Sequence, residues 1–274
     1  MIADETLARM AGELTAVRGV VGVVLGGSRA RGDALPTSDV DLGIYYEGVP
    51  DTAVLGRLAS RWSGRDVAVG VPGSWGPWVD AGGWLDVEGT AVDWILRDVD
   101  RVAAQADRAN RGEFAFHPQA GHPLGFLDVS YAAELATGVV LADPAGRLAS
   151  LRAAVTAYPL ALRDAMVGAL WEADFLVGAA TKGARRADTT YVSLALARAV
   201  LLCAHALHAQ AGRWVTNEKG LAPAVATLPD APAGFSRDAA LALGALGATE
   251  ESLRAAVAAV ARLVGETRAA LGER

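Results

Sequence analysis

Two aspartates that lie two residues apart inside an apolar run constrain this chain more than any other feature of its sequence. The run reads Asp39-Val40-Asp41-Leu42 and continues to Ile44. Alternate side chains of a β-strand point to opposite faces, so both carboxylates would share one face, about 6.6–7 Å apart along the backbone, while the apolar neighbours point into a core. Like charges on one strand face are costly unless a positive charge lies between them. A divalent cation would supply that charge, and Mg²⁺ prefers carboxylate and phosphate oxygens.

A glycine-rich turn precedes the aspartates. The apolar stretch 20–25 predicts a strand that leads into Gly26-Gly27-Ser28, and ten residues separate this turn from Asp39. Glycine allows the backbone to approach a phosphate closely. A helix that begins near Ser28 would direct free N–H groups at the anion, with the serine hydroxyl as a further donor. Arg29 and Arg31 are close enough in sequence to add positive charge.

A third carboxylate is expected on a separate strand. Asp93 interrupts the apolar stretch 91–96, and a charge in such a place is expensive without a partner. Three carboxylates could hold two Mg²⁺ ions about 3.5–4 Å apart, which would activate a hydroxyl and neutralise a leaving pyrophosphate.

These residues together resemble the nucleotidyltransferase superfamily, which includes DNA polymerase beta and the aminoglycoside nucleotidyltransferases. The shared pattern is an apolar residue, the Gly-Gly-Ser turn at 26–28, a spacer, then Asp39 and Asp41, with Asp93 on a later strand. The resemblance covers residues 1–100. It implies that the chain transfers a nucleoside monophosphate, usually AMP from ATP, to a hydroxyl and releases pyrophosphate, with Mg²⁺ as cofactor.

The apolar periodicity predicts an α+β chain with two parts. A mixed-sheet catalytic domain is expected over residues 1–118, with strands at 20–25, 40–46 and 66–71, a hairpin over 83–96, and helices at 4–18, 51–62 and 98–109. An all-helical domain that binds substrate and nucleotide is expected over 119–274. Its helices are predicted at 127–137, 145–156, 160–181, 187–211, 217–227, 236–246 and 249–271.

Charge and composition restrict the partners. The formal net charge is −6 and no long basic run is present, which disfavours a nucleic-acid substrate and favours a neutral or cationic small molecule. The single cysteine, Cys203, reads as a core residue. The N-terminus lacks the features of a signal peptide and no membrane span is predicted, so a cytoplasmic location is expected. The sequence does not give the oligomeric state.

Further candidates for the site come from the part after residue 100. Glu134 is similar in placement to a glutamate that serves as base in some aminoglycoside nucleotidyltransferases; the alternative is an ordinary surface glutamate on a helix. Asp93 is the other candidate base. Similar enzymes bring a lysine or arginine onto the triphosphate, and Lys219 is the candidate here, with a solvated turn as the alternative. Tyr191 is a weaker candidate contact for the nucleotide.

Aromatic residues and histidines leave alternatives open. Trp75, Trp78 and Trp84 could wall a substrate pocket by stacking or could simply pack the core. His122 lies in a glycine- and proline-rich segment that turn chemistry also explains. His205 and His208 lie on the same apolar helix as Cys203, and the sequence favours a structural role for both histidines.

Two other functions compete with transfer to a small molecule such as an aminoglycoside-like antibiotic. One is a protein- or tRNA-directed nucleotidyltransferase of toxin or regulatory type, which should show an open or basic surface beside the site. The other is a nucleotide-binding module that has lost catalysis, which the three intact aspartates disfavour.

Overall fold

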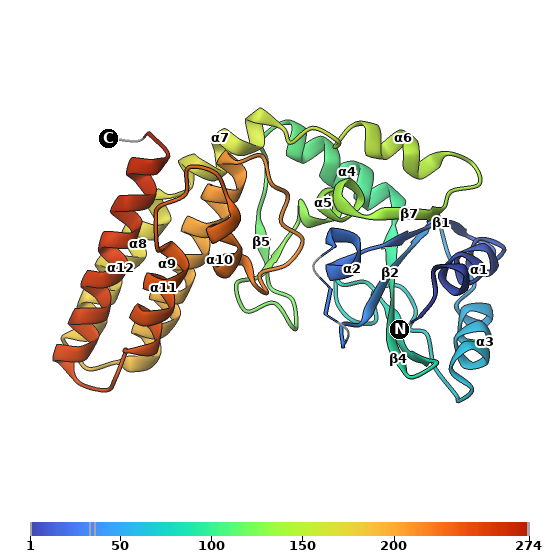
Figure 1. Cartoon of the computed structure of the whole chain (residues 1–274), viewed down its shortest axis with the longest axis horizontal. Coiled ribbons are helices and arrows are strands. Elements are labelled where there is room, and N and C mark those ends of the chain that lie inside the picture. Colours follow the sequence, from blue (N-terminus) through green and yellow to red (C-terminus); the bar gives the residue numbers. More distant parts are fainter. Residues whose placement is uncertain (1, 33, 36, 273–274) are drawn as a thin grey trace. The chain divides into compact units, whose positions relative to one another are not determined.

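A computed structural model describes residues 2–32, 34–35 and 37–272. The chain divides into two compact units, one formed by Met1–Ala109 with Phe114–Ala157 and the other by Asn110–Glu113 with Tyr158–Arg274. Figure 1 shows both units, with elements labelled where there is room. The domain division after residue 118 stays a prediction, because compact units of a fold and functional domains need not coincide.

The first unit contains a five-stranded mixed sheet, as expected for an α+β chain. The strand order is β3-β4-β2-β1-β7, and β4 lies parallel to β2 while the other neighbouring pairs are antiparallel. The strands of this sheet are β1 (Val20–Leu25), β2 (Val40–Tyr46), β3 (Gly82–Val87), β4 (Thr90–Asp98) and β7 (Val139–Ala142).

Two helices cover one face of the sheet. They are α1 (Asp4–Thr15) and α3 (Thr52–Ser63), whose apolar residues recur at helical spacing. Met10, Leu14 and Leu55 are fully buried together with the even-numbered residues of β2 and β4, such as Leu42 and Trp94. The remaining, odd-numbered residues of these strands therefore point to the opposite face.

That opposite face is only partly covered by helices. Residues of α4 (Val99–Asn110), α5 (Ser130–Thr137) and α6 (Arg147–Ala153) form a second core cluster that includes Tyr45 of β2 and Val24 of β1. The cluster covers the later part of β2, and it leaves Asp41, near the start of this strand, half-buried.

The second unit is helical. Its helices are α7 (Leu160–Gly168), α8 (Trp171–Ala184), α9 (Thr189–Gln210), α10 (Leu221–Ala224), the 3₁₀ turn η1 (Val225–Thr227), α11 (Phe235–Gly244) and α12 (Glu250–Ala270). Cys203, His205 and His208 of α9 are buried, which confirms their structural assignment. Burial lowers the pKa of His205 to about 3, with a smaller contribution from His208.

The structure corrects two predictions about the sheet. Residues 66–71 form no strand, although Val67 and Val69 are buried. The N–H of Val67 donates to Ser60 Oγ, and the N–H of Gly70 donates to the carbonyl oxygen of Gly82 in β3. In contrast, β7 was expected to be part of a helical region, and it pairs with β1 at the edge of the sheet. The prediction placed no strand after residue 126 because a run of four residues carries too little periodicity to be told from a helix segment.

Helix α9 agrees with the helix predicted over residues 187–211. By length and apolar composition it could cross a membrane, and 72% of the apolar window is buried within the structure. Such burial is typical of a core helix, which passes the same test of length and composition.

Candidate active site

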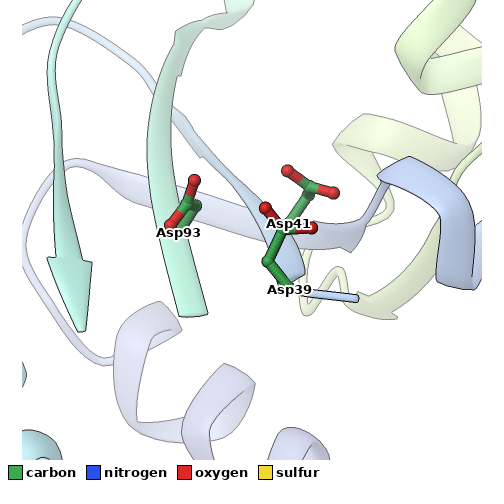
Figure 2. A group of neighbouring side chains, drawn as sticks. All are labelled: Asp39, Asp41 and Asp93. Carbon is green, nitrogen blue, oxygen red and sulfur yellow. The ribbon is translucent and has the colours of Figure 1, made fainter. Parts of the chain in front are cut away.

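The structure brings the three predicted carboxylates together (Figure 2). Asp39 directly precedes β2, Asp41 lies in β2, and Asp93 lies opposite Asp41 in the parallel pairing of β2 with β4. Each carboxylate offers an oxygen, and these oxygens all lie within 4.8 Å of one another. Carboxylate oxygens at this spacing form a donor set that suits a hard divalent cation such as Mg²⁺.

The electrostatics of this cluster favour a bound cation. The pKa of Asp41 is raised to about 6, chiefly by burial and then by the neighbouring charges of Asp39, Asp93 and Glu134, whereas Arg31 lowers it. Burial and like charges both penalise the ionised form. A divalent cation would remove that penalty, because its charge can neutralise the carboxylates.

The glycine turn lies directly against Asp41. The N–H of Gly26 donates to the carbonyl oxygen of Asp41 at 2.8 Å. Gly27 has a positive φ of 61°, and a Cβ at this position would lie 1.7 Å from Asp41 Oδ2. Glycine is therefore required at position 27 both for its backbone conformation and for its close approach to the carboxylate.

A short helix, α2 (Gly27–Arg31), follows the turn and contains Ser28. A helix begins where it was predicted, but it has only five residues. Its dipole is therefore weak, so the backbone N–H groups of the turn are the main feature offered to an anion.

Arg29 supports the segment that leads to Asp39. Its Nε donates to the carbonyl oxygen of Asp39 at 3.1 Å and its Nη2 to that of Ser38 at 3.0 Å. These bonds position the first carboxylate from the side of the glycine turn. The predicted contact of Arg29 with a nucleotide stays a prediction.

Glu134 forms an ion pair with Arg97. Arg97 Nε donates to Glu134 Oε2 at 2.5 Å and Nη2 donates to Oε1 at 2.7 Å, so the pair is bidentate. The Arg97 side chain is 8% exposed and that of Glu134 is 25% exposed. Burial alone would lower the pKa of Arg97, but the charge and hydrogen bonds of Glu134 raise it overall. Both oxygens of the candidate base thus accept from a permanently charged group.

The other two candidates lie in the second unit. Tyr191 is exposed in the first turn of α9, where its N–H donates to Asp188 Oδ1. Lys219 is exposed just before α10, and its N–H donates to Asn217 Oδ1. Their contacts with a nucleotide stay predictions.

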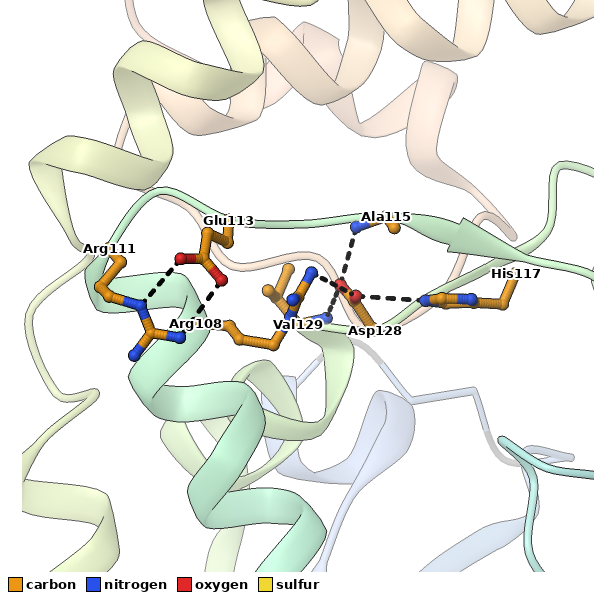
Figure 3. Close-up of polar contacts among 7 residues, drawn as sticks. All are labelled: Arg108, Arg111, Glu113, Ala115, His117, Asp128 and Val129. Atoms are coloured by element: carbon orange, nitrogen blue, oxygen red, sulfur yellow. Dashed lines mark hydrogen bonds and ion pairs between the residues drawn. The ribbon is translucent and has the colours of Figure 1, made fainter.

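A buried carboxylate that the sequence analysis did not single out organises the loops of the first unit (Figure 3). Asp128 accepts from the backbone N–H groups of Ala115 and Val129, and it pairs with His117 at 3.2 Å and Arg108 at 3.3 Å. It lies beside a small sheet of β5 (Phe116–His117) and β6 (Phe126–Leu127). The signal in the sequence is a lone Asp between apolar residues, as for Asp93.

The tryptophans separate into two groups. Trp78 stacks on His117 at a centroid distance of 4.0 Å and also contacts Phe126, so it packs the loops. Trp75 instead stacks on Trp84, with ring centroids 4.5 Å apart. His122 contacts Phe126 edge-on.

The match of the chain to a known protein family agrees with this geometry. Residues 7–74 match the family model described as "Nucleotidyltransferase domain", which includes the glycine turn, Asp39 and Asp41. No curated protein sequence matches the chain. A nucleotidyltransferase-like protein from Exiguobacterium sibiricum 255-15 aligns in structure over 98% of this chain and 78% of its own, with 12% identity and a TM-score of 0.43. The assignment to the nucleotidyltransferase superfamily rests on the family match of residues 7–74 and on the geometry of the three carboxylates.

Proposed function

Because this chain belongs to the nucleotidyltransferase superfamily and is a transferase of phosphorus-containing groups, we propose that it is a Mg²⁺-dependent enzyme that moves AMP from ATP to a hydroxyl of a small molecule. The observation that carries this proposal is the convergence of Asp39, Asp41 and Asp93 beside the glycine turn. Bound Mg²⁺ would supply positive charge to the phosphates and to the attacking oxygen.

The reaction exchanges one phosphorus–oxygen bond for another. The acceptor oxygen forms a bond to the α-phosphorus while the bond from this phosphorus to the bridging oxygen breaks, and pyrophosphate leaves with the electron pair. Asp39 and Asp41 would hold the cation, and backbone N–H groups at Gly27 and Ser28 would hold the phosphates that leave. Arg29 keeps this arrangement in place through its bonds to the chain before β2.

The proton of the acceptor hydroxyl goes to a carboxylate, and Asp93 is the better candidate in the first unit. It belongs to the carboxylate cluster, whereas both oxygens of Glu134 accept from Arg97. We therefore propose that Glu134 acts on the site through its negative charge, which raises the pKa of Asp41.

Two residues of the second unit stay candidate contacts for the nucleotide. Lys219 offers an ammonium group and Tyr191 offers a ring and a hydroxyl; both side chains are exposed. The formal net charge of −6 suits a neutral or cationic acceptor, and an aminoglycoside-like antibiotic has this chemistry. A cytoplasmic enzyme would meet both ATP and such a compound.

Pyrophosphate release tests the proposal. The protein is incubated with Mg²⁺, each of the four nucleoside triphosphates, and a panel of aminoglycosides and lincosamides. We expect release with ATP and at least one acceptor, and none with Asp41→Asn. Silence with every nucleotide and acceptor, from folded protein, contradicts the small-molecule assignment. AMP found covalently on a co-expressed protein or on tRNA would instead identify a macromolecular acceptor.

A further inference from the structure

The pairing of three strands places a tryptophan beside the carboxylates. Trp84 of β3 lies directly opposite Asp93 of β4, and Asp93 lies opposite Asp41 of β2. Directly paired residues point to the same face of a sheet, with Cβ atoms about 4.5–5.5 Å apart in an antiparallel pair. Trp84, Asp93 and Asp41 therefore form a row across the face that carries the candidate active site.

Trp84 is exposed although it is large and apolar. Its exposed fraction is 61%. Trp75 covers one side of the indole, with an angle of 13° between the two rings. Behind this stack, Gly82 faces Trp75: a Cβ at Gly82 would lie 3.0 Å from the Trp75 ring and would also collide with the carbonyl oxygen of Trp94. We call Trp75 and Trp84 the tryptophan stack; it leaves the Trp84 indole exposed on its other side, and Trp84 is the residue paired with Asp93.

The loop that carries Trp75 is held in one conformation. Gln119 Nε2 donates to the carbonyl oxygen of Trp75 at 2.9 Å, and Gln119 Oε1 accepts from the N–H groups of Trp78 and Val79. Asp80, which is 3% exposed, accepts from the N–H of Gly73 through Oδ1. A stack that is fixed before a ligand arrives loses little entropy on binding.

The row formed by Trp84, Asp93 and Asp41 indicates whether the tryptophan stack lies on the side of the nucleotide or on the side of the acceptor. The sheet order is β3-β4-β2-β1, so the stack on β3 and the glycine turn after β1 lie on opposite sides of Asp93 and Asp41. In phosphoryl transfer the attacking and leaving oxygens lie roughly in line. If the leaving phosphates are held at the glycine turn, the attacking hydroxyl comes from the side of the stack.

The open indole side also restricts the chemistry of the acceptor. The face of an aromatic ring carries negative charge density, which attracts ammonium groups and polarised C–H groups and disfavours anions. Asp86 has the same parity as Trp84 on β3 and is exposed, so it adds negative charge near the stack. A saturated ring that carries both hydroxyl and amino groups has this chemistry: its C–H groups can pack on the indole face, and its ammonium groups are attracted by the nearby carboxylates.

We propose that the tryptophan stack is the acceptor subsite of the proposed reaction and that Trp84 is the residue that holds the ring of the acceptor there. Trp84 contacts the ring and sets the position of its hydroxyl beside Asp93. This inference rests on the proposed function for the direction of attack, while the binding of such a ring by Trp84 can be measured without turnover.

The test uses kanamycin A as the ring probe and spermine as a cation that has neither ring nor hydroxyl. Binding to the full-length protein is followed by saturation-transfer NMR, and Mg²⁺–ATP affinity is measured in parallel by calorimetry.

We compare Trp84→Ala and Trp84→Phe with Trp171→Ala, which removes a tryptophan that is 64% exposed in α8 of the second unit. We expect Trp84→Ala to weaken kanamycin A binding about tenfold, the size of a cation–π and stacking contact. Trp84→Phe should retain most binding, and Trp171→Ala and the ATP affinity should not change.

The outcomes separate this inference from the proposed function. Kanamycin A that fails to bind, binds equally to Trp84→Ala, or binds no better than spermine overturns the acceptor subsite. If pyrophosphate release then still depends on Asp41, the proposed function stands without the subsite. If Trp84-dependent binding is found but no nucleotide is turned over, the subsite stands and the proposed reaction fails. If the protein turns over ATP and Trp84→Ala raises the KM for the acceptor while the KM for ATP stays constant, both the proposed reaction and the acceptor subsite are supported.

Discussion

Two groups of charges lie on the same face of β4, and they are organised in opposite ways. Arg97 and Glu134 form a bidentate pair in which the chain itself supplies both signs of charge. Four residues earlier on the strand, Asp93 lies with Asp39 and Asp41 in a cluster of a single sign. The raised pKa of Asp41 shows the electrostatic cost of the second arrangement.

This difference distinguishes a structural group of charges from a functional one. A buried ion pair that is complete within the chain resists the removal of either partner. A cluster of like charges is instead stabilised by a ligand of opposite charge. The repulsion among the carboxylates lowers the stability of the fold, and the same repulsion favours the binding of a cation. Substitutions in the two groups should therefore have opposite effects on stability and on activity.

The largest effect is expected for Asp41→Asn. This change removes one charge from the cluster, so transfer should fall by about 10³-fold or more, because a metal-held phosphate and attacking oxygen lose their alignment. The fold should remain, since repulsion decreases. Pyrophosphate release and circular dichroism measure the two properties; a variant that keeps its turnover would contradict the assignment of the site.

Gly27→Ala should have the next largest effect on transfer. The new Cβ would lie 1.7 Å from Asp41 Oδ2, so the carboxylate or the turn must move, and we expect a loss of about 10²-fold, as for other small misplacements of reacting groups. Gly32→Ala is the matched control, because Gly32 also has a positive φ but no atom within 4 Å of a Cβ. The control should lose about 1–2 kcal/mol of stability and little activity. Equal losses of activity in both variants would show that backbone strain alone is responsible.

Arg97→Met should act on stability. It leaves Glu134 half-buried without its bidentate partner, at a cost of about 3 kcal/mol in the free energy of unfolding. The control is Arg254→Ala, which breaks an exposed pair with Glu250 and should change stability by less than about 1 kcal/mol. Urea denaturation measures both. Adding Glu134→Leu to Arg97→Met should recover much of the loss; a double variant no more stable than Arg97→Met would show that the ion pair is not the cause.

The smallest expected effect is the pH dependence caused by Asp41. Its pKa is about 6 in the folded protein and lower in the unfolded chain, so the folded state binds the proton more tightly. Without metal, this carboxylate therefore lowers the stability as pH rises from about 4 to 6, by about 1–2 kcal/mol after allowance for solvent. Asp41→Asn should remove this decrease, which urea denaturation in EDTA at pH 4.5 and 7 would show. Mg²⁺ affinity should rise over the same range, because protons compete with the cation; identical pH profiles for both proteins would exclude Asp41 as the origin.

Much of the catalytic half could be predicted because its signals are local. The alternation around Asp41 fixes a strand and a face, and Asp93 interrupts an apolar run on the strand that pairs with it. The hairpin of β3 and β4 follows from the Glu88-Gly89 turn. In each case, the period of the strand and the chemistry of the turn agree.

The remaining features depend on long-range packing. The partner of Glu134 is 37 residues away on another element, and nothing near either residue in the sequence identifies the pair. The tryptophan stack arises because β3 is paired with β4 and the preceding loop folds back over Gly82. Similarly, β7 is too short to show periodicity, and its pairing with β1 defines it. The roles of Lys219 and Tyr191 stay predictions.

The most direct test of the central claim is a crystal structure with Mn²⁺, as a substitute for Mg²⁺, and a non-hydrolysable ATP analogue. The account predicts an anomalous difference peak about 2.0–2.3 Å from oxygens of Asp39 and Asp41, with the triphosphate at Gly27 and Ser28. A peak elsewhere, or no peak at saturating Mn²⁺ with these carboxylates bound to arginines, would contradict it.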